Sequence, residues 1–389
     1  MEKGWFEELG IAFDPEPYGN IPSTENLVQA LASGACDVAS ASAVFMLPSV
    51  KDVPPFKWWV HGDMFQGYAL MAQPDAGYKS VDEFIAEGKS PDEAMKLAVE
   101  QMKGKRFAYP PEAAIKGFID LALSKAGMSL EDVTSIVAED AKTWAMMIAD
   151  QADFQVGGVP SRLTLETRGF KPIITSQNLA QFAKPSADSV ELRSVFQDGW
   201  GSMDSWIDAN YDTMMRMASV MFRIAQFQNT NRDEALAIHV PFLNSAAGTD
   251  ITPETAVVVY ESLDPFIPFD GQAAWYLDEN NPLNYDYVTG SYIKLWEEKG
   301  LFAPGEIKVS DISMAKEVYQ EFLDLKAEAD KLFPEAEAAI AEAKEAGKDT
   351  AQAQELLDKA RYWYDAFDYL DAVTWATSAI EWAQYEASQ

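Results

Sequence analysis

The sequence predicts an α/β fold, with mixed sheets flanked by helices, that is followed by an all-helical C-terminal segment. Up to residue 314, short apolar runs typical of strands alternate with stretches that have the 3.6-residue periodicity of helices. From residue 315 onward the chain is rich in Ala and Glu, which indicates helices alone. Alternation of this kind predicts parallel or mixed sheets that are covered on both faces.

The composition excludes several classes of protein. The 62 Asp and Glu residues against 30 Lys and Arg give a formal charge of -32, which argues against nucleic acid and anionic membrane surfaces as partners. No apolar run reaches the length of a membrane helix, so we do not expect the chain to be membrane-inserted. The single cysteine, Cys36, excludes a disulfide framework, and the two histidines leave little for zinc chemistry. We expect no cofactor and no metal site.

The first elements follow from apolar spacing and turn residues. Apolar side chains at helical spacing fill one face of EKGWFEELG, and Gly10 ends that helix. The next predicted elements are a strand at 11–15, a helix at 26–33, a strand running into a helix at 37–47, the strand FKWWV at 56–60 and the loop HGDMFQG at 61–67.

A second series of strands and helices begins at residue 68. Its predicted elements are strands at 68–73, 105–111, 134–140, 154–159 and 171–176, with helical stretches at 79–101, 112–127 and 143–151. Long helices are predicted at 206–229 and 253–263, with a loop rich in Tyr, Asn, Pro and Asp at 275–290. We expect the chain to cross between two lobes near Gly62–Gly67 and Ser176–Ala183.

Residues 315–389 are predicted to form a helical hairpin extension. Within 316–389 there are 17 acidic and 7 basic residues, and KEAGKDT is the one clear break. Residues 351–387 carry two apolar stripes at helical spacing, joined by the turn AFDY, which predicts a hairpin of two helices. We expect this hairpin to pack on the main body as a cap, with a partner-docking arm as the alternative.

Five segments in succession resemble landmarks of one known family. They are EKGWFEELGI, ALASGACDVASAS, MKGKRFAYPP, LSKAGMSLEDVTSIV and IADQADFQVGGVP. Their order and spacing are similar to those of the type II periplasmic solute-binding proteins of ABC importers. Within that class they resemble the branch that binds sulfonates, nitrate and thiamine precursors, the NMT1/THI5-like branch. The resemblance covers residues 2–310 and leaves the C-terminal hairpin outside.

The resemblance implies two α/β lobes, joined by a hinge, that close around a solute. Lobe 1 would comprise residues 1–65 and 182–314, and lobe 2 would comprise residues 66–181. In such proteins a first strand and its ligand-facing loop precede EKGWF, so we expect that strand to be missing here or replaced by another segment. The implied function is the extracytoplasmic solute-binding component of an importer, which delivers its solute to a membrane permease and is not an enzyme.

Ligand-facing residues in this architecture lie where strands lead into helices, because free N–H groups at a helix start bind polar ligand atoms. The candidate residues are Asn20, Ser40, Ser42, Phe65, Tyr109, Glu112, Trp144 and Gly158. Other interpretations stay open: the serines suit helix capping, Glu112 suits complementing a helix dipole, and Trp144 suits a buried core.

Departures from the family pattern indicate the charge of the solute that the chain would bind. Glu112 stands where relatives carry small residues, Arg106 is the only arginine nearby in the sequence, and Gly158 with Val159 would widen the pocket. We therefore expect a neutral or cationic organic solute, heterocyclic ones included, in place of a sulfonate or nitrate. Aromatic surfaces bind flat rings by stacking and cations through their π faces.

Two other functions are kept as alternatives. An enzyme of the same fold would need a nucleophile with partners, as in desulfinase-type relatives with cysteine, histidine and arginine, and Cys36 with His61 is the pair to consider. Thiamine-pyrimidine synthases, which resemble this fold, rely on a cysteine-rich motif that this chain lacks. The last alternative is a scaffold protein that acts through the C-terminal hairpin.

Overall fold

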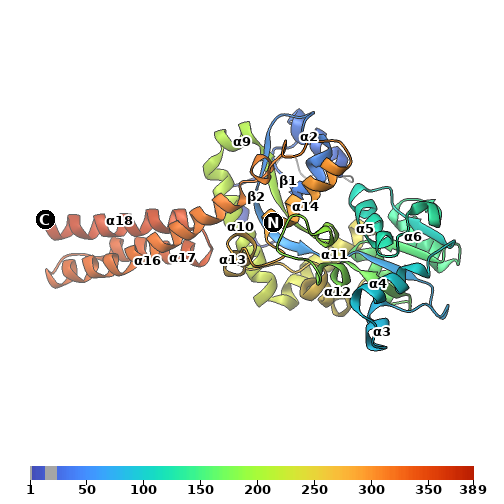
Figure 1. The fold of residues 1–389 in the computed structure, drawn as a ribbon. Helices are drawn as coiled ribbons and strands as arrows, with labels where there is room; N and C mark the ends of the chain where they lie inside the picture. Colours follow the sequence, from blue (N-terminus) through green and yellow to red (C-terminus); the bar gives the residue numbers. More distant parts are fainter. Residues whose placement is uncertain (1, 14–23) are drawn as a thin grey trace.

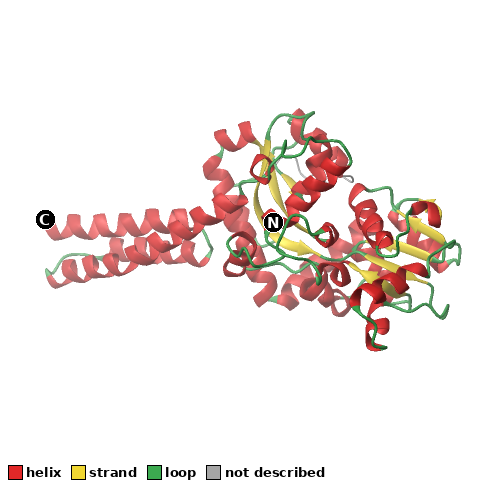
Figure 2. Ribbon diagram, viewed as in Figure 1, coloured by secondary structure: helices red, strands yellow, loops and turns green. Residues whose placement is uncertain are grey.

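The computed structural model describes residues 2–13 and 24–389, and its strands form two separate sheets. Figure 1 shows helices around both sheets, and a group of long helices extends to one side of them. Figure 2 shows that the strands of the two sheets lie apart, with helices between and around them. The predicted mixed α/β architecture with a helical C-terminal region is therefore confirmed.

One sheet has three antiparallel strands in the order β1-β8-β2. These strands are β1 Ala39–Ala41, β8 Phe196–Met203 and β2 Phe56–Phe65. The predicted strand at 56–60 is present, but the predicted loop at 61–67 is wrong, because β2 continues to Phe65 by pairing with β8. The strand predicted at 11–15 is wrong for residues 11–13, and residues 14 and 15 lie outside the described part of the chain.

Strand β8 has no counterpart in the sequence prediction, and two glycines explain why. A Cβ atom at Gly199 would lie 1.9 Å from the backbone oxygen of Val60, and one at Gly201 would lie 2.3 Å from the ring of Trp58. Close approach of β2 therefore requires glycine at positions where an ordinary strand pattern has side chains.

The other sheet has five strands in the order β5-β4-β6-β3-β7. These strands are β3 Ala69–Ala72, β4 Arg106–Tyr109, β5 Thr134–Val137, β6 Phe154–Gly157 and β7 Lys171–Thr175. Each falls within a predicted strand. Strand β4 is parallel to β5 and β6, whereas β3 is antiparallel to β6 and β7. The ends of β4, β5 and β6 therefore meet at one edge of this sheet.

Helices cover both sheets. The α-helices of the main body are α1 Trp5–Glu8, α2 Thr24–Ser33, α3 Val81–Ala86, α4 Pro91–Glu100, α5 Ala113–Ser124, α6 Asp140–Ile148, α7 Val159–Glu166, α8 Ser176–Ala180, α9 Asp204–Ala209, α10 Tyr211–Thr230, α11 Arg232–Ala247, α12 Pro253–Val258, α13 Ala273–Tyr276, α14 Tyr285–Glu298 and α15 Val309–Ile312. A π-helical turn, Val259–Leu263, continues α12. Helix α11 was not predicted, and α14 begins inside the predicted loop at 275–290. Across the described residues, no helix is both long enough and apolar enough to cross a membrane.

The C-terminal region is a three-helix arm. Helix α18, Tyr369–Ser388, packs along both α16, Ala315–Glu345, and α17, Ala351–Asp365, so the predicted hairpin forms and α16 adds a third helix. At the base of the arm the Tyr369 ring lies 5.6 Å from Phe269 of the main body. The expectation that the hairpin caps the main body is wrong for the distal part, which extends away from both sheets (Figure 1). This distal part has a small apolar core of its own.

Candidate functional site

An aromatic cluster lies where the chain passes from one sheet to the other. Phe65, the last residue of β2, pairs with Phe196, the first residue of β8, and their rings stack with centroids 4.8 Å apart. The ring of Tyr68, three residues further along the chain, lies 4.7 Å from Phe65 and 6.1 Å from Phe196. We call Phe65, Tyr68 and Phe196 the aromatic cluster.

Two aspartates share the sheet face of the aromatic cluster. Asp63 and Asp198 are cross-strand partners, and each is two residues from a ring of the cluster in its own strand. Because side chains alternate along a strand, Asp63 and Phe65 lie on one face, as do Asp198 and Phe196. The Asp63 carboxylate accepts a hydrogen bond from the backbone N–H of Asp198.

Asp264 reaches the same place from a segment beside β2. The Gln66 N–H donates to the Leu263 carbonyl at 2.7 Å, which holds this segment along the edge of β2. One carboxylate oxygen from each of Asp63, Asp198 and Asp264 lies within 4.8 Å of the other two, and we call these residues the aspartate trio. Burial raises the pKa of all three carboxyl groups, that of Asp264 to about 7, and repulsion from their neighbours adds to the shifts of Asp63 and Asp198.

Acidic side chains also gather at the edge of the five-stranded sheet where β4, β5 and β6 end. Glu112 is the exposed residue before α5, and Asp140 is the first residue of α6. The hydroxyl of Ser161, in the first turn of α7, donates a hydrogen bond to Asp140. Burial raises the pKa of Asp140, and the bond from Ser161 opposes that shift. Both acids lie at helix starts, where the helix dipole favours negative charge.

Tyr68 connects the acidic groups of the two sheets. It precedes Ala69, which pairs with Gly157 at the end of β6, so Tyr68 lies at the same edge as Glu112 and Asp140. Burial raises the pKa of the Tyr68 hydroxyl, and the negative charges of Glu112, Asp198 and Asp140 raise it further. The aromatic cluster, the aspartate trio, Glu112 and Asp140 therefore form one acidic and aromatic region, which we call the junction.

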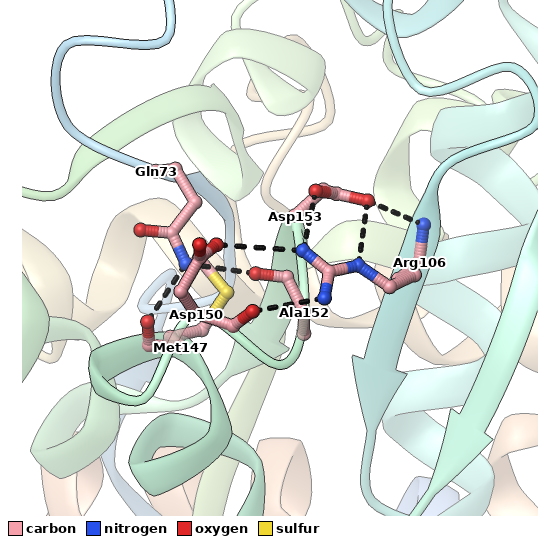
Figure 3. Close-up of polar contacts among 6 residues, drawn as sticks. All are labelled: Gln73, Arg106, Met147, Asp150, Ala152 and Asp153. Atoms are coloured by element: carbon pink, nitrogen blue, oxygen red, sulfur yellow. Dashed lines mark hydrogen bonds and ion pairs between the residues drawn. The ribbon is translucent and has the colours of Figure 1, made fainter.

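Arg106, the nearest arginine to Glu112 in the sequence, lies at the opposite edge of the sheet. Arg106 begins β4 and Tyr109 ends it, which places their backbones about 10 Å apart. The Arg106 guanidinium binds the Asp153 carboxylate at 2.9 Å and the Asp150 carbonyl at 2.8 Å (Figure 3). The prediction that Arg106 lies near the site is therefore wrong.

Three of the predicted ligand residues meet at the junction. Phe65 is part of the aromatic cluster, and Glu112 acts electrostatically on Tyr68. A Cβ atom at Gly158 would lie 3.7 Å from the Phe65 ring and 3.9 Å from the Tyr68 ring, so this glycine borders both. Tyr109 lies at the same edge, where it is buried with its ring 5.3 Å from Phe107.

The other predicted residues lie in different surroundings. Ser40 is exposed in the middle of β1, and Ser42 is buried before a short 3-10 helix without capping it through its side chain. Trp144 is half-buried in α6, packed against an apolar cluster with its ring 5.9 Å from the Arg168 guanidinium. Asn20 lies outside the described residues.

The sequence interpretation missed six residues of the junction, namely Asp63, Tyr68, Asp140, Phe196, Asp198 and Asp264. Phe196 and Asp198 alternate with Gln197 in β8, which is the pattern of a strand with two chemically different faces. That short alternation was the available signal, and the glycines that follow it obscured the strand. Nothing local to Asp264 indicates its position, because it depends on the pairing of residues 263–267 with β2.

Cys36 and His61, the pair proposed for an enzyme alternative, are not hydrogen-bonded to each other: His61 Nδ1 contacts Tyr276, and its Nε2 has no hydrogen-bond partner among the described residues. His61 is fully buried in β2, its Nδ1 lies 2.8 Å from the Tyr276 hydroxyl, and burial lowers its pKa to about 3. Burial and the neighbouring Asp37 raise the pKa of the Cys36 thiol, which disfavours the nucleophilic thiolate. Cys36 forms no disulfide, and its backbone N–H donates to the Ala30 carbonyl at 3.3 Å.

Comparison with known proteins gives matches in family and in fold. Residues 92–182 match the family model described as NMT1/THI5 like. A search of curated proteins finds no match. A periplasmic sulfonate-binding protein of Methylobacillus flagellatus KT is similar with a TM-score of 0.55 at 13% identity, covering 83% of this chain and 85% of that one.

Two further solved structures have the same fold. The periplasmic nitrate-binding protein of Synechocystis PCC 6803 gives a TM-score of 0.52 at 13% identity, with 82% of each chain covered. The desulfurization enzyme DSZB gives 0.52 at 10% identity, covering 83% of this chain and 94% of that one. The fold therefore occurs in both binding proteins and an enzyme. This chain has the fold of the periplasmic solute-binding proteins of ABC importers, and its residues 92–182 carry the NMT1/THI5-like segment that the sequence resemblance predicted.

Proposed function

We propose that this chain is the extracytoplasmic solute-binding component of an ABC importer. It binds a small organic solute at the junction between two hinged lobes, residues 1–65 with 182–314 and residues 66–181, and delivers it to a membrane permease. The observation that carries the proposal is the junction itself. There the helices that follow strands of the five-stranded sheet begin close to an aromatic face of the three-stranded sheet, next to the segment that links β2 to β3. The shared fold with sulfonate- and nitrate-binding proteins supports it.

The solute is neutral or cationic. Glu112, Asp140 and the aspartate trio would repel an anion, and the two buried arginines closest to this region in the chain are each paired with a glutamate. Arg162 binds Glu166 at 2.8 Å, and Arg193 binds Glu298 at 2.8 Å. The half-buried ring of Phe65, packed on the buried rings of Tyr68 and Phe196, offers a face for a flat or cationic group.

A melting-temperature screen tests this proposal. Neutral, cationic and anionic organic solutes are added separately, and a bound solute raises the melting temperature in proportion to the logarithm of its concentration above Kd. We expect shifts from members of the neutral or cationic sets, and we expect Phe65→Ala to reduce them. Phe84→Ala, a half-buried phenylalanine in α3, is the matched control and should leave them unchanged. Product formation from a solute, or shifts by anions alone, would contradict the proposal.

A second candidate function is protein contact through the arm. It is favoured by two aromatic side chains near the distal end of α18, Trp382 at 42% and Tyr385 at 56% exposure, with rings 6.2 Å apart. The double variant Trp382→Ser, Tyr385→Ser should then lose a cross-linked partner while solute-induced melting shifts stay the same. Equal cross-linking by variant and wild type would remove this candidate.

A further inference from the structure

The spacing of the aspartate trio matches the oxygen shell of one calcium ion. Calcium binds six to eight oxygens at about 2.3–2.6 Å, so oxygens on opposite sides of the ion lie about 5 Å apart. The three carboxylate oxygens lie within 4.8 Å of one another. They come from β2, β8 and the segment after the π-helical turn, so three separate parts of the chain converge on one point.

The trio also has unmet hydrogen-bonding capacity. The Oδ1 atoms of Asp63 and Asp264 are sealed from solvent and accept no hydrogen bond. Within the described part of the chain, no lysine, arginine or histidine forms an ion pair with any of the three. Buried carboxylates are normally paired or bound to a metal, because a buried oxygen without a partner loses the hydrogen bonds that water would give it.

We propose that Asp63, Asp198 and Asp264 bind a calcium ion at the junction. Carboxylate oxygens are the ligands that this hard cation prefers, and water or backbone carbonyls complete its shell. With all three carboxylates ionised, the bound ion would leave a net charge of about -1, so the junction stays acidic. It would also fasten the segment at 263–267 to β2 and β8 directly beside the aromatic cluster.

Calorimetric titration of the full chain tests the proposal without any solute. The protein is stripped with EDTA, dialysed into 150 mM NaCl to screen its surface charge, and titrated with CaCl2. We expect one saturable site and a higher melting temperature in calcium. Asp198→Asn should weaken calcium binding at least tenfold, because it removes one ligand and one charge.

The controls separate this site from the many other acids of the chain. Asp208→Asn changes the net charge equally at an exposed position in α9 and should bind calcium like the wild type. Asp264→Asn serves as a second variant if circular dichroism shows that Asp198→Asn is misfolded. The proposal is overturned if wild type shows no saturable calcium binding at millimolar concentration, or if the folded trio variant binds as tightly as Asp208→Asn. These outcomes do not depend on whether the chain binds an organic solute.

Discussion

The two sides of the junction hold negative charge in different ways. At the edge of the five-stranded sheet, Glu112 is exposed at a helix start, and Asp140 begins a helix, where its Oδ2 accepts a hydrogen bond from Ser161 while no described residue donates to its Oδ1. On the face of the three-stranded sheet, the aspartate trio has no helix start, and two of its oxygens have no donor. A helix start supplies free N–H groups and a favourable dipole, whereas a sheet has only a small net dipole. Acids on the sheet face therefore need a cation or a proton.

The largest expected effect comes from a substitution that separates the two strands carrying Asp63 and Asp198. Gly199→Ala would place a Cβ atom 1.9 Å from the Val60 backbone oxygen, so β2 and β8 must separate. We expect a loss of more than about 3 kcal/mol in the free energy of unfolding, measured by urea denaturation. Gly117→Ala in α5, where nothing lies within 4 Å, is the control and should stabilise the protein by about 0.5–1 kcal/mol. Equal stability of the two variants would show that β8 does not pack on β2 in this way.

The same comparison explains which side could be predicted. The helix starts after β4 and β6 follow Pro110, Pro111 and the pair Gly157–Gly158, which are local signals that need no knowledge of distant contacts. The sheet face depends on β8, which pairs with a strand more than 130 residues earlier in the chain and requires glycines for close approach. Local patterns carry no information about such pairing.

The arm shows a similar limit. Its apolar stripes correctly indicated that α17 and α18 form a hairpin. They did not indicate which surface covers those stripes, because a stripe specifies that a face is buried and not what buries it. In the structure the distal stripes are covered by α16, with Ala336 and Ile340 in the same apolar core as Leu357 and Ala379.

A position at a helix start does not always offset the cost of burying an acidic side chain. Asp368 is an example. It caps α18 by accepting the Asp371 N–H, yet burial raises its pKa from 3.8 to about 6, with added repulsion from Asp371 and Asp212 and a partial offset from Arg216. The folded state then binds more protons than the unfolded state between about pH 4 and 6. This group should therefore lower the stability by up to about 3 kcal/mol as the pH rises through that window.

Urea denaturation at pH 4.5 and pH 7.5 measures the contribution of Asp368. We expect Asp368→Asn to lose less stability than the wild type between these two values, because asparagine does not titrate. An unchanged difference between the two pH values would mean that the helix start fully compensates the buried charge.

Matched Asp→Asn substitutions on the two sides of the junction should change the stability in opposite directions. In EDTA, Asp264→Asn removes a buried charge without a donor and should stabilise the protein by about 1–3 kcal/mol. Asp140→Asn weakens the bond from Ser161 and should destabilise it by about 1–3 kcal/mol. Chemical denaturation of both variants at pH 8 measures the pair. If both variants lost stability, the two sides would not differ as described.

The smallest expected effect concerns Glu112. This exposed residue lies at the start of α5 without capping it through a side-chain hydrogen bond, so its charge complements the helix dipole. Glu112→Gln should cost about 0.3–1 kcal/mol of stability, less at high salt. Thermal denaturation at two salt concentrations measures this cost, and a cost that does not depend on salt would indicate a role other than dipole complementation.

Mass spectrometry of the small molecule released on unfolding tests the central claim most directly. The protein is purified without denaturation, washed and then unfolded, and the released solute is identified and added back to the refolded chain. The account predicts a neutral or cationic organic molecule that rebinds unchanged and raises the melting temperature. Release of a sulfonate or another anion that rebinds at the junction, or conversion of the molecule on rebinding, would contradict the account.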